Sequence, residues 1–179
     1  MNAAETGLPI KAITAGQPLV LRLRQPEDVV PDVSTEWDHW PDDSLPSPSH
    51  DAPVRLVIEW GDRIVGTMSW HATDYGPTQG SRAWNIGIAL TPDARGQGIG
   101  STAQRMLAEC LLTFSERVEA STDITNIAEQ RALERAGFTR EGVLRSAQHR
   151  GDGLHHDLVL YSLVRRDLDG GAPSTASRP

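Results

Sequence analysis

Apolar and polar residues alternate along several short segments of the chain, which is the pattern of strands with one buried face. Three such segments follow one another between residues 54 and 90, and the first two are joined by the short turn Trp60-Gly-Asp-Arg63. This succession predicts an antiparallel meander. Over the whole chain, the pattern predicts strands at residues 19–23, 54–59, 64–71, 83–90, 118–122, 138–144 and 156–164.

Two further segments carry apolar residues at helical spacing. In residues 101–114 the apolar face holds Met106, Leu107, Cys110, Leu111 and Phe114. Residues 126–136 end at Gly137, which suits the left-handed position that follows a helix. Both segments are therefore predicted to be helices.

The order of these elements predicts a single α+β domain with a mixed sheet. A further helix start is expected at Pro26, whereas residues 31–53 hold five prolines and are expected to be irregular. We assign residues 17–166 to the domain. Because the two ends lack apolar periodicity, residues 1–16 are assigned to a mobile N-terminal tail and residues 167–179 to a disordered C-terminal tail.

The composition narrows the classes of function. With 17 Lys+Arg against 24 Asp+Glu and a net charge of −7, the chain lacks the clustered cations of nucleic-acid binding, so no nucleic-acid partner is expected. It shows no membrane-span or signal-peptide pattern, so we expect a soluble, cytoplasmic protein that is a monomer or a homodimer. Lys11 is the only lysine, which excludes Schiff-base chemistry, and the only cysteine, Cys110, is expected to pack in the core.

Three glycines alternate in the stretch Arg95-Gly-Gln-Gly-Ile-Gly100, between a predicted strand and a predicted helix. Residues without a Cβ allow a tight turn and close approach of a ligand to the backbone. The helix that follows begins with unpaired N–H groups at the positive end of its dipole. This combination suits a diphosphate, although glycine-rich turns also occur without any ligand.

The same stretch, after a strand ending Ile88-Ala-Leu90, resembles the acetyl-CoA-binding signature Q/R-x-x-G-x-G/A of the GNAT family of N-acetyltransferases. Asn126 begins NIAEQRALERAGF, which is similar to a segment of the Rim-type ribosomal-protein N-terminal acetyltransferases, and residues 157–163 resemble the final strand of that branch. The resemblance implies the GNAT fold, a mostly antiparallel splayed sheet with helices on both sides. The strands near Leu90 and Val118 would part to admit the pantetheine arm of acetyl-CoA.

The resemblance also implies how acetyl-CoA is held. The backbone of Ile88, Ala89 and Leu90 would pair with the pantetheine amides as a strand does. The Asn126 side chain would bind the cofactor arm or a water near the thioester. The pyrophosphate would be held by the N–H groups of Arg95, Gly96, Gln97, Gly98, Ile99, Gly100 and Ser101.

Acetyl transfer to a primary amine needs a neutral nucleophile and a proton for the leaving thiolate. Many relatives carry a glutamate base at the position of Asn85, which cannot act as a base but could position a water, with the proton leaving through His71, Asp74 or solvent. Relatives often place a hydroxyl acid at the positions of Leu133 or Glu129. Those hydroxyls are absent from this chain.

Two other residues are candidates for the leaving-group acid. Glu129 could donate a proton if it is desolvated, although a glutamate on a helix is commonly solvated. Tyr161 is the second candidate, although a strand tyrosine commonly packs in the core. Positioning the amine against a thioester is itself a large source of rate acceleration, so transfer does not require a strong acid or base.

Residues 27–51 contain eight carboxylates and no lysine or arginine, together with Trp37 and Trp40. In the GNAT family the corresponding segment lines the acceptor cleft, where carboxylates and indoles favour a cationic amine. Trp70 and His71 are further candidates for that cleft. The alternative is a solvated acidic loop. No metal site is expected, since His155 and His156 point to opposite faces of a strand.

The resulting hypothesis is an acetyl-CoA-dependent N-acetyltransferase that acts on a small-molecule amine or a protein N-terminus by direct transfer in a ternary complex. The alternative is a non-catalytic CoA-binding module of the same fold, suggested by Asn85 and Leu133 at positions where relatives carry acid and base groups.

Overall fold

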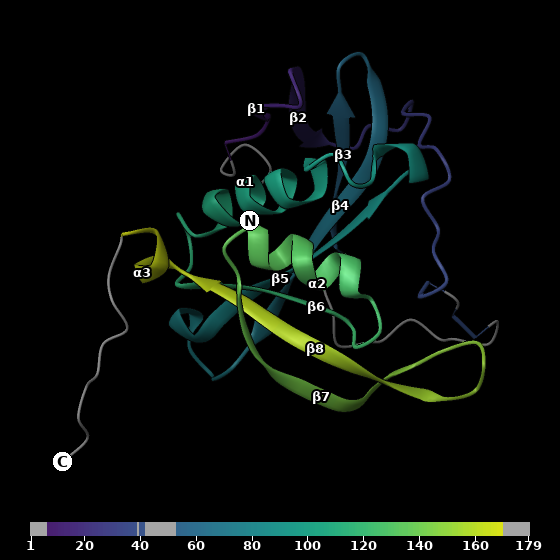
Figure 1. Ribbon diagram of the computed structural model, residues 1–179. Helices are drawn as coiled ribbons and strands as arrows, with labels where there is room; N and C mark the ends of the chain where they lie inside the picture. Colours follow the sequence, from purple (N-terminus) through teal and green to yellow (C-terminus); the bar gives the residue numbers. More distant parts are fainter. Residues whose placement is uncertain (1–6, 39, 42–52, 170–179) are drawn as a thin grey trace.

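The computed structural model describes residues 7–38, 40–41 and 53–169 (Figure 1). Its strands are β1 (Ile10–Thr14), β2 (Gln17–Leu23), β3 (Val54–Trp60), β4 (Arg63–Asp74), β5 (Arg82–Leu90), β6 (Arg117–Asp123), β7 (Thr139–His149) and β8 (His155–Val164). Its helices are α1 (Ile99–Leu111), α2 (Ile127–Arg135) and α3 (Arg165–Leu168), with 3₁₀ turns η2 (Gln79–Ser81) and η3 (Pro92–Ala94). The strands and the two longer helices that the sequence pattern predicts are all present.

The strands form one sheet in the order β1-β2-β3-β4-β5-β6-β8-β7. Strands β1 to β5 form an antiparallel meander, of which the sequence pattern predicted β3 to β5, and β6, β8 and β7 continue the sheet with antiparallel pairs. The pair β5–β6 is parallel. The predicted mixed, mostly antiparallel sheet is therefore confirmed.

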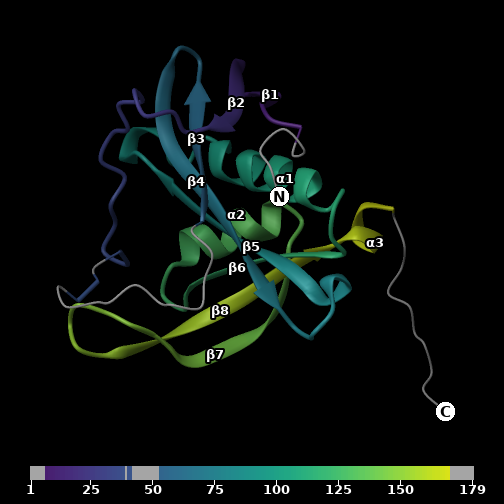
Figure 2. The same cartoon turned by 180° about the vertical axis from the view of Figure 1, so that it is seen from behind.

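Helices α1 and α2 lie on the same face of the sheet, in front of it in Figure 1 and behind it in Figure 2. Helix α1 packs against β1, β2 and β5, whereas α2 packs against β6 and β7. The helix expected to start at Pro26 is not formed, and residues 24–38 contain only turns and irregular segments. No helix in the described segments combines the length and the hydropathy needed to cross a bilayer.

The core lies between this face and the two helices. Met68, Trp70, Trp84 and Ile86 of the central strands are at most 9% exposed, and α1 contributes Leu107 among its buried residues. Burial of large side chains on one face explains the alternation from which the strands were predicted.

Strand β1 lies in the segment assigned to the N-terminal tail. It pairs with β2 through the tight turn at Ala15 and Gly16, which have φ of 49° and 75°. Two consecutive residues with positive φ are typical of a hairpin turn, and Gly16 suits it well. The alternation Ile10-Lys-Ala-Ile-Thr14 was too short to be separated from the polar residues before it.

Candidate functional site

Strands β5 and β6 pair over only two residues and then separate. The parallel pairs are Trp84 with Val118 and Asn85 with Glu119. Beyond them, β5 continues to Leu90 without a partner on the β6 side. An extended strand edge with free backbone groups can pair with an amide-bearing ligand.

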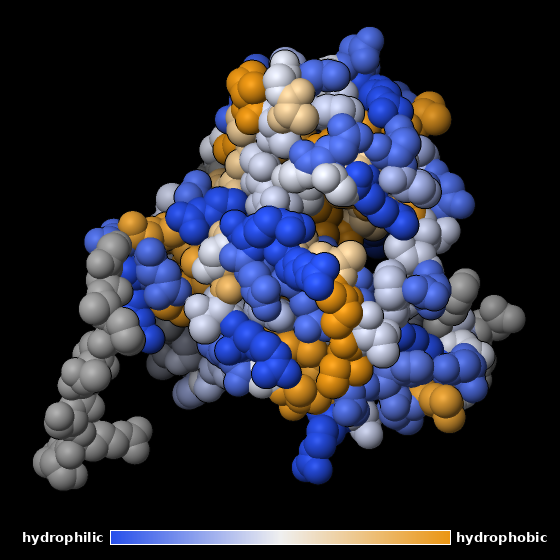
Figure 3. Space-filling model, viewed as in Figure 1, coloured by the Kyte–Doolittle hydropathy of each residue, from blue (hydrophilic) through white to orange (hydrophobic). Residues whose placement is uncertain are grey.

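This separation opens a cleft of about 600 Å³. Its walls are the outer half of β5, the start of α1, the end of β6 and one side of α2 along its whole length. Figure 3 shows the hollow on the helical face, between the N-terminal end of α1 and α2. A cleft of this volume is large enough for a cofactor-sized ligand.

The glycine-rich stretch forms one end of the cleft. Gly96 and Gly98 have φ of 74° and 79°, and Gly98 is the N-cap of α1. The first hydrogen bond of α1 runs from Thr102 N–H to Gly98 C=O (3.0 Å), so the N–H groups of the three residues before Thr102 have no partner within the helix. These N–H groups and the helix dipole favour an anion.

The side chains of this stretch have mixed roles. Arg95 lines the cleft but donates two hydrogen bonds to Leu90 C=O (3.0 and 2.8 Å), so this carbonyl is engaged. Gln97 donates to Asp93 C=O (2.7 Å) and, like the buried Ile99, does not line the cleft. Gly96, Gly98, Gly100 and Ser101 do line it.

Asn126 and Glu129 lie together at the start of α2, and both line the cleft. The Asn126 side-chain oxygen accepts a hydrogen bond from Glu129 N–H (3.2 Å) and so caps the helix. Its NH₂ group is the part left for a ligand. The sequence pattern did not distinguish these two uses of one side chain.

Glu129 is half-buried in the wall of the cleft. Gln104 of α1 donates a hydrogen bond to it from Nε2. Burial raises the pKa of Glu129 to about 7, although the bond from Gln104 acts in the opposite direction. A carboxyl with this pKa is partly protonated near neutral pH and can donate a proton.

Asn85 and His71 face one another across β5 and β4, and Glu119 is the partner of Asn85 on β6. All three lie next to the point where β5 and β6 separate, but none lines the cleft itself. Glu119 is 3% exposed and accepts hydrogen bonds from Tyr75 Oη (2.7 Å) and Arg117 Nε (3.1 Å). Glu119 was not among the residues predicted from the sequence, although it pairs in register with Asn85, the position that resembles the glutamate of many relatives.

Two predicted site residues lie in the core. Tyr161 is 1% exposed, and its hydroxyl donates to Glu134 Oε1 (3.2 Å). Trp70 is 2% exposed and packs on the helical face. Both are absent from the lining of the cleft. The strand pattern places them on a buried face, where an aromatic side chain stabilises the core.

The irregular segment after β2 forms part of the cleft wall. Thr35, Trp37, Asp38 and Trp40 line the cleft, and Trp37 Nε1 donates to Thr125 Oγ1 (3.3 Å) at the start of α2. Glu36 is not part of this lining. Asp42, Asp43 and Asp51, which are also among the eight carboxylates of this segment, lie outside the described residues.

A polar cluster closes the side of the cleft formed by β6 and β7. Arg150 forms an ion pair with Asp123 (2.7 Å) and donates two bonds to Gln148 Oε1 (2.8 and 2.6 Å). Asp123 also accepts from Thr125 N–H and Oγ1, and although burial opposes it, these bonds and Arg150 lower the pKa of Asp123. His156 approaches the same carboxylate at 3.7 Å.

Residues Asp123, Gln148 and Arg150 all line the cleft, and sequence reasoning missed them. They are far apart along the chain and come together because β8 lies between β6 and β7 in the sheet. Asp123 directly follows a predicted strand, whereas Gln148 and Arg150 lie between two predicted strands, where the sequence pattern gave no signal.

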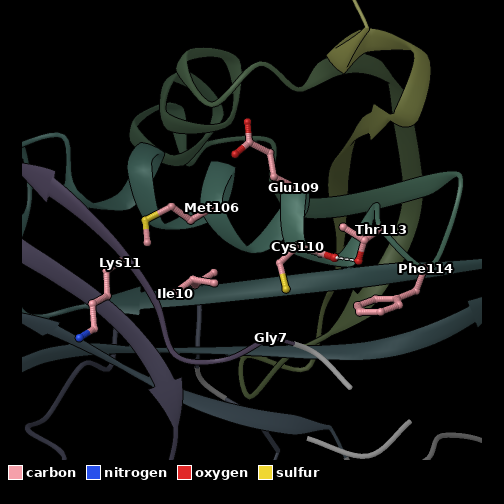
Figure 4. Close-up of a pocket in the computed structure, with 8 residues that line it drawn as sticks. All are labelled: Gly7, Ile10, Lys11, Met106, Glu109, Cys110, Thr113 and Phe114. Atoms are coloured by element: carbon pink, nitrogen blue, oxygen red, sulfur yellow. Dashed lines mark hydrogen bonds between the residues drawn. The ribbon is translucent and has the colours of Figure 1, made fainter. Parts of the chain in front are cut away.

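A second hollow of about 450 Å³ lies between the N-terminal residues and α1 (Figure 4). The Cys110 thiol is turned towards it, beside Ile10 and Phe114. Burial raises the pKa of this thiol, so the thiolate is disfavoured at neutral pH. This hollow carries no activated nucleophile.

Comparison with known proteins identifies the family and the fold. Residues 13–139 match the acetyltransferase (GNAT) domain family. The chain is 33% identical over 119 residues to YdaF, a proposed ribosomal N-acetyltransferase of Bacillus subtilis strain 168, covering 65% of this chain and 62% of YdaF. It is 30% identical over 128 residues to the N-acetyltransferase aca1 of Schizosaccharomyces pombe, covering 68% of this chain and 58% of aca1.

Two solved structures extend the comparison. Mycobacterium smegmatis RimJ in complex with CoA-disulfide superposes with a TM-score of 0.56 at 25% identity, over 65% of this chain and 55% of RimJ. The microcin C7 self-immunity acetyltransferase MccE, in complex with acetyl-CoA and AMP, gives 0.54 at 26% identity, over 63% of this chain and 61% of MccE. The chain thus spans about 60% of the length of its curated relatives. By its sequence and its fold, the chain belongs to the GNAT acetyltransferase family.

Proposed function

We propose that this protein transfers the acetyl group of acetyl-CoA directly to a primary amine, in a complex that holds both substrates. The observation that carries the proposal is the separation of β5 from β6 beside the glycine-rich start of α1. A free strand edge and an anion-binding helix terminus thus meet in one cleft. Acetyl-CoA needs both, because its pantetheine arm carries amides and its other end a diphosphate.

The chain's own groups have distinct roles in this proposal. The N–H groups of the cleft-lining residues Gly96, Gly98, Gly100 and Ser101 bind the pyrophosphate, and the backbone of Ile88 and Ala89 pairs with the pantetheine arm. Leu90 contributes less through its carbonyl, which Arg95 occupies. The Asn126 NH₂ group, on a residue held by its helix-capping bond, binds the arm or a water near the thioester.

Transfer requires two proton movements, one at each side of the acetyl carbonyl. As the amine nitrogen bonds to the carbonyl carbon and the carbon–sulfur bond breaks, Glu129 donates its proton to the sulfur. The amine loses its proton to a water beside Asn85 and from there to His71 or solvent. The partly protonated state of Glu129 near neutral pH supports this assignment.

The acceptor is proposed to be a cationic amine, either a small molecule or a protein N-terminus. Trp37, Trp40 and Asp38 line the cleft, and an indole or carboxylate attracts a cation. YdaF is named as a ribosomal N-acetyltransferase, so a ribosomal-protein N-terminus is the first acceptor to test.

The second candidate function is a CoA-binding module without turnover. It is favoured by Asn85, which cannot act as a base at the position where many relatives have a glutamate. Neither Asn85 nor His71 lines the cleft, which is consistent with this alternative.

One experiment separates the two functions. The purified chain is incubated with acetyl-CoA and a panel of amines and N-terminal peptides, thiol release is followed, and products are identified by mass spectrometry. Acetylated amine formed faster than background supports the transferase. Tight binding of acetyl-CoA with no thiol release for any acceptor would favour the module.

A further inference from the structure

Gln104 is a polar residue within the apolar, buried stripe of α1. The other buried residues of this helix are Ile99, Ala103, Leu107, Ala108 and Leu111. Gln104 is 1% exposed and does not line the cleft. Burial of a primary amide among aliphatic side chains costs free energy unless its polar atoms are hydrogen-bonded.

Only half of this amide is satisfied in the described part of the chain. Its Nε2 donates to Glu129 Oε1 across the interface between α1 and α2. Its Oε1 is buried and accepts no hydrogen bond. A buried amide oxygen next to a carboxyl group is a suitable acceptor for a carboxylic acid proton.

The Glu129 carboxyl can exist as the neutral acid, whose proton the Gln104 oxygen could accept. It lines the cleft, is half-buried, and forms no ion pair among the described residues. Gln104 is therefore the side chain that contacts it with a hydrogen bond. Arg131 and Arg135 of α2 line the same cleft, but neither forms an ion pair with Glu129. Burial therefore holds the pKa of Glu129 at about 7, and both protonation states are populated near neutral pH.

We propose that Gln104 is a positioning residue that satisfies the Glu129 carboxyl in both of its protonation states. Its NH₂ group donates to the carboxylate, and after a half-turn of the amide its oxygen accepts the proton of the neutral acid. Glu129 then stays in one place throughout a cycle of proton loss and gain. The use of this cycle in catalysis rests on the proposed acetyl transfer.

In that reaction the balance is simple. The neutral Glu129 gives its proton to the sulfur as the carbon–sulfur bond breaks, and CoA leaves as the thiol. The resulting carboxylate is held by the Gln104 NH₂ group until solvent returns a proton. Gln104 touches neither substrate and acts only through Glu129.

The test measures the protonation of Glu129 directly in the protein without substrates. Glutamate side-chain carboxyls are labelled with ¹³C and titrated by NMR, and the Glu129 signal is identified by its loss in Glu129→Gln. In the unmutated protein this signal should titrate near pH 7. In Gln104→Met, which keeps the volume but removes donor and acceptor, the pKa should rise by about one unit or more, because the carboxylate loses its donor.

A matched control is available on the neighbouring helix. The Gln130 side chain donates to the backbone carbonyls of Asp123 and Ile124, not to the Glu129 carboxyl. Gln130→Met should therefore leave the Glu129 titration unchanged. If both methionine variants shift the signal equally, the effect comes from loosening of α2 and the proposal is wrong.

A second variant covers the case in which Gln104→Met does not fold. In Gln104→Glu the two carboxyls would share one proton and titrate in two separated steps. Independent titration of the two groups at ordinary values would overturn the proposal, as would a Glu129 signal near its usual pKa in the unmutated protein. These readouts do not need turnover, so they stay decisive if no acceptor is acetylated.

Where an acceptor is found, kinetics adds a separate reading. The high-pH limb of kcat should move with the NMR titration in Gln104→Met, while KM for acetyl-CoA stays within about twofold. A limb that does not move while the NMR titration does would show that Gln104 positions Glu129 but that Glu129 is not the acid.

Discussion

Gly98 is the residue on which acetyl-CoA binding should depend most sharply. Its φ and ψ are 79° and −5°, in the left-handed region, at the N-cap of α1. A Cβ added there would meet only Thr14 Cγ2, at 3.9 Å, which is an ordinary van der Waals contact. The cost comes from the backbone, since the left-handed conformation costs an L-residue roughly 1–2 kcal/mol, and a β-branched side chain adds to this.

The loop can respond in two ways. It can stay left-handed and lower the stability of the fold, or it can leave this conformation and turn its N–H groups away from the cleft. In the second case acetyl-CoA must restore the conformation on binding, and the loss of affinity equals the cost of doing so. A cost of about 1.4 kcal/mol corresponds to a tenfold rise in Kd, and we expect at least this change.

Calorimetric titration with acetyl-CoA measures the effect, and Gly153→Val is the matched control. Gly153 has φ of 78° with nothing within 4 Å of an added Cβ, and it lies in the turn between β7 and β8, outside the cleft lining. This control should lower stability without changing Kd. A folded Gly98→Val protein with unchanged Kd would refute the assignment of this loop to the diphosphate.

Other substitutions test the remaining parts of the site. Glu129→Gln should lower kcat by about 10²–10⁴ and remove the loss of rate above about pH 7, where the acid is deprotonated, as a pH–rate profile would show. Tyr161→Phe should keep kcat within about threefold, measured in the same assay, because its hydroxyl contacts Glu134 outside the cleft. Asp123→Asn leaves buried Arg150 without its carboxylate, and urea unfolding should show a loss of about 3 kcal/mol. Asp38→Asn should raise KM for a cationic acceptor, and added salt should do the same to the parent protein, since the attraction is screened; a KM indifferent to both changes would make this segment a solvated loop.

Much of the fold could be predicted from the sequence because its signals are local. The alternation in β3 to β5 reflects burial of one face, and the two-residue turn between β3 and β4 leaves an antiparallel pair as the simple outcome. The glycine stretch is equally local, since the conformations at Gly96 and Gly98 require those residue types.

The polar cluster of Asp123, Gln148 and Arg150, which we place on the proposed acceptor side of the cleft, could not be predicted from local sequence patterns. Its residues come together only through the pairing of distant strands. Asp123 meets Arg150 only through the order β6-β8-β7, which no short segment of sequence specifies. The strand pattern makes Tyr161 a candidate for the leaving-group acid, because it does not show that Tyr161 pairs with Ala120 on β6 or that its hydroxyl bonds to Glu134. Gln104 is a polar residue within a buried helical stripe, and its role could be inferred only once the structure placed Glu129 opposite it.

The proposed cofactor half and the proposed acceptor half of the cleft should respond differently to amino-acid substitution. The cofactor half depends on backbone groups, so most side-chain substitutions there leave the N–H groups in place, and only changes at positive-φ glycines remove them. The acceptor half depends on side chains from the 35–40 segment, β6 and β7, held by single contacts such as Trp37 with Thr125. A chain with this construction can change its amine acceptor by substituting a few of these side chains while retaining its acyl donor.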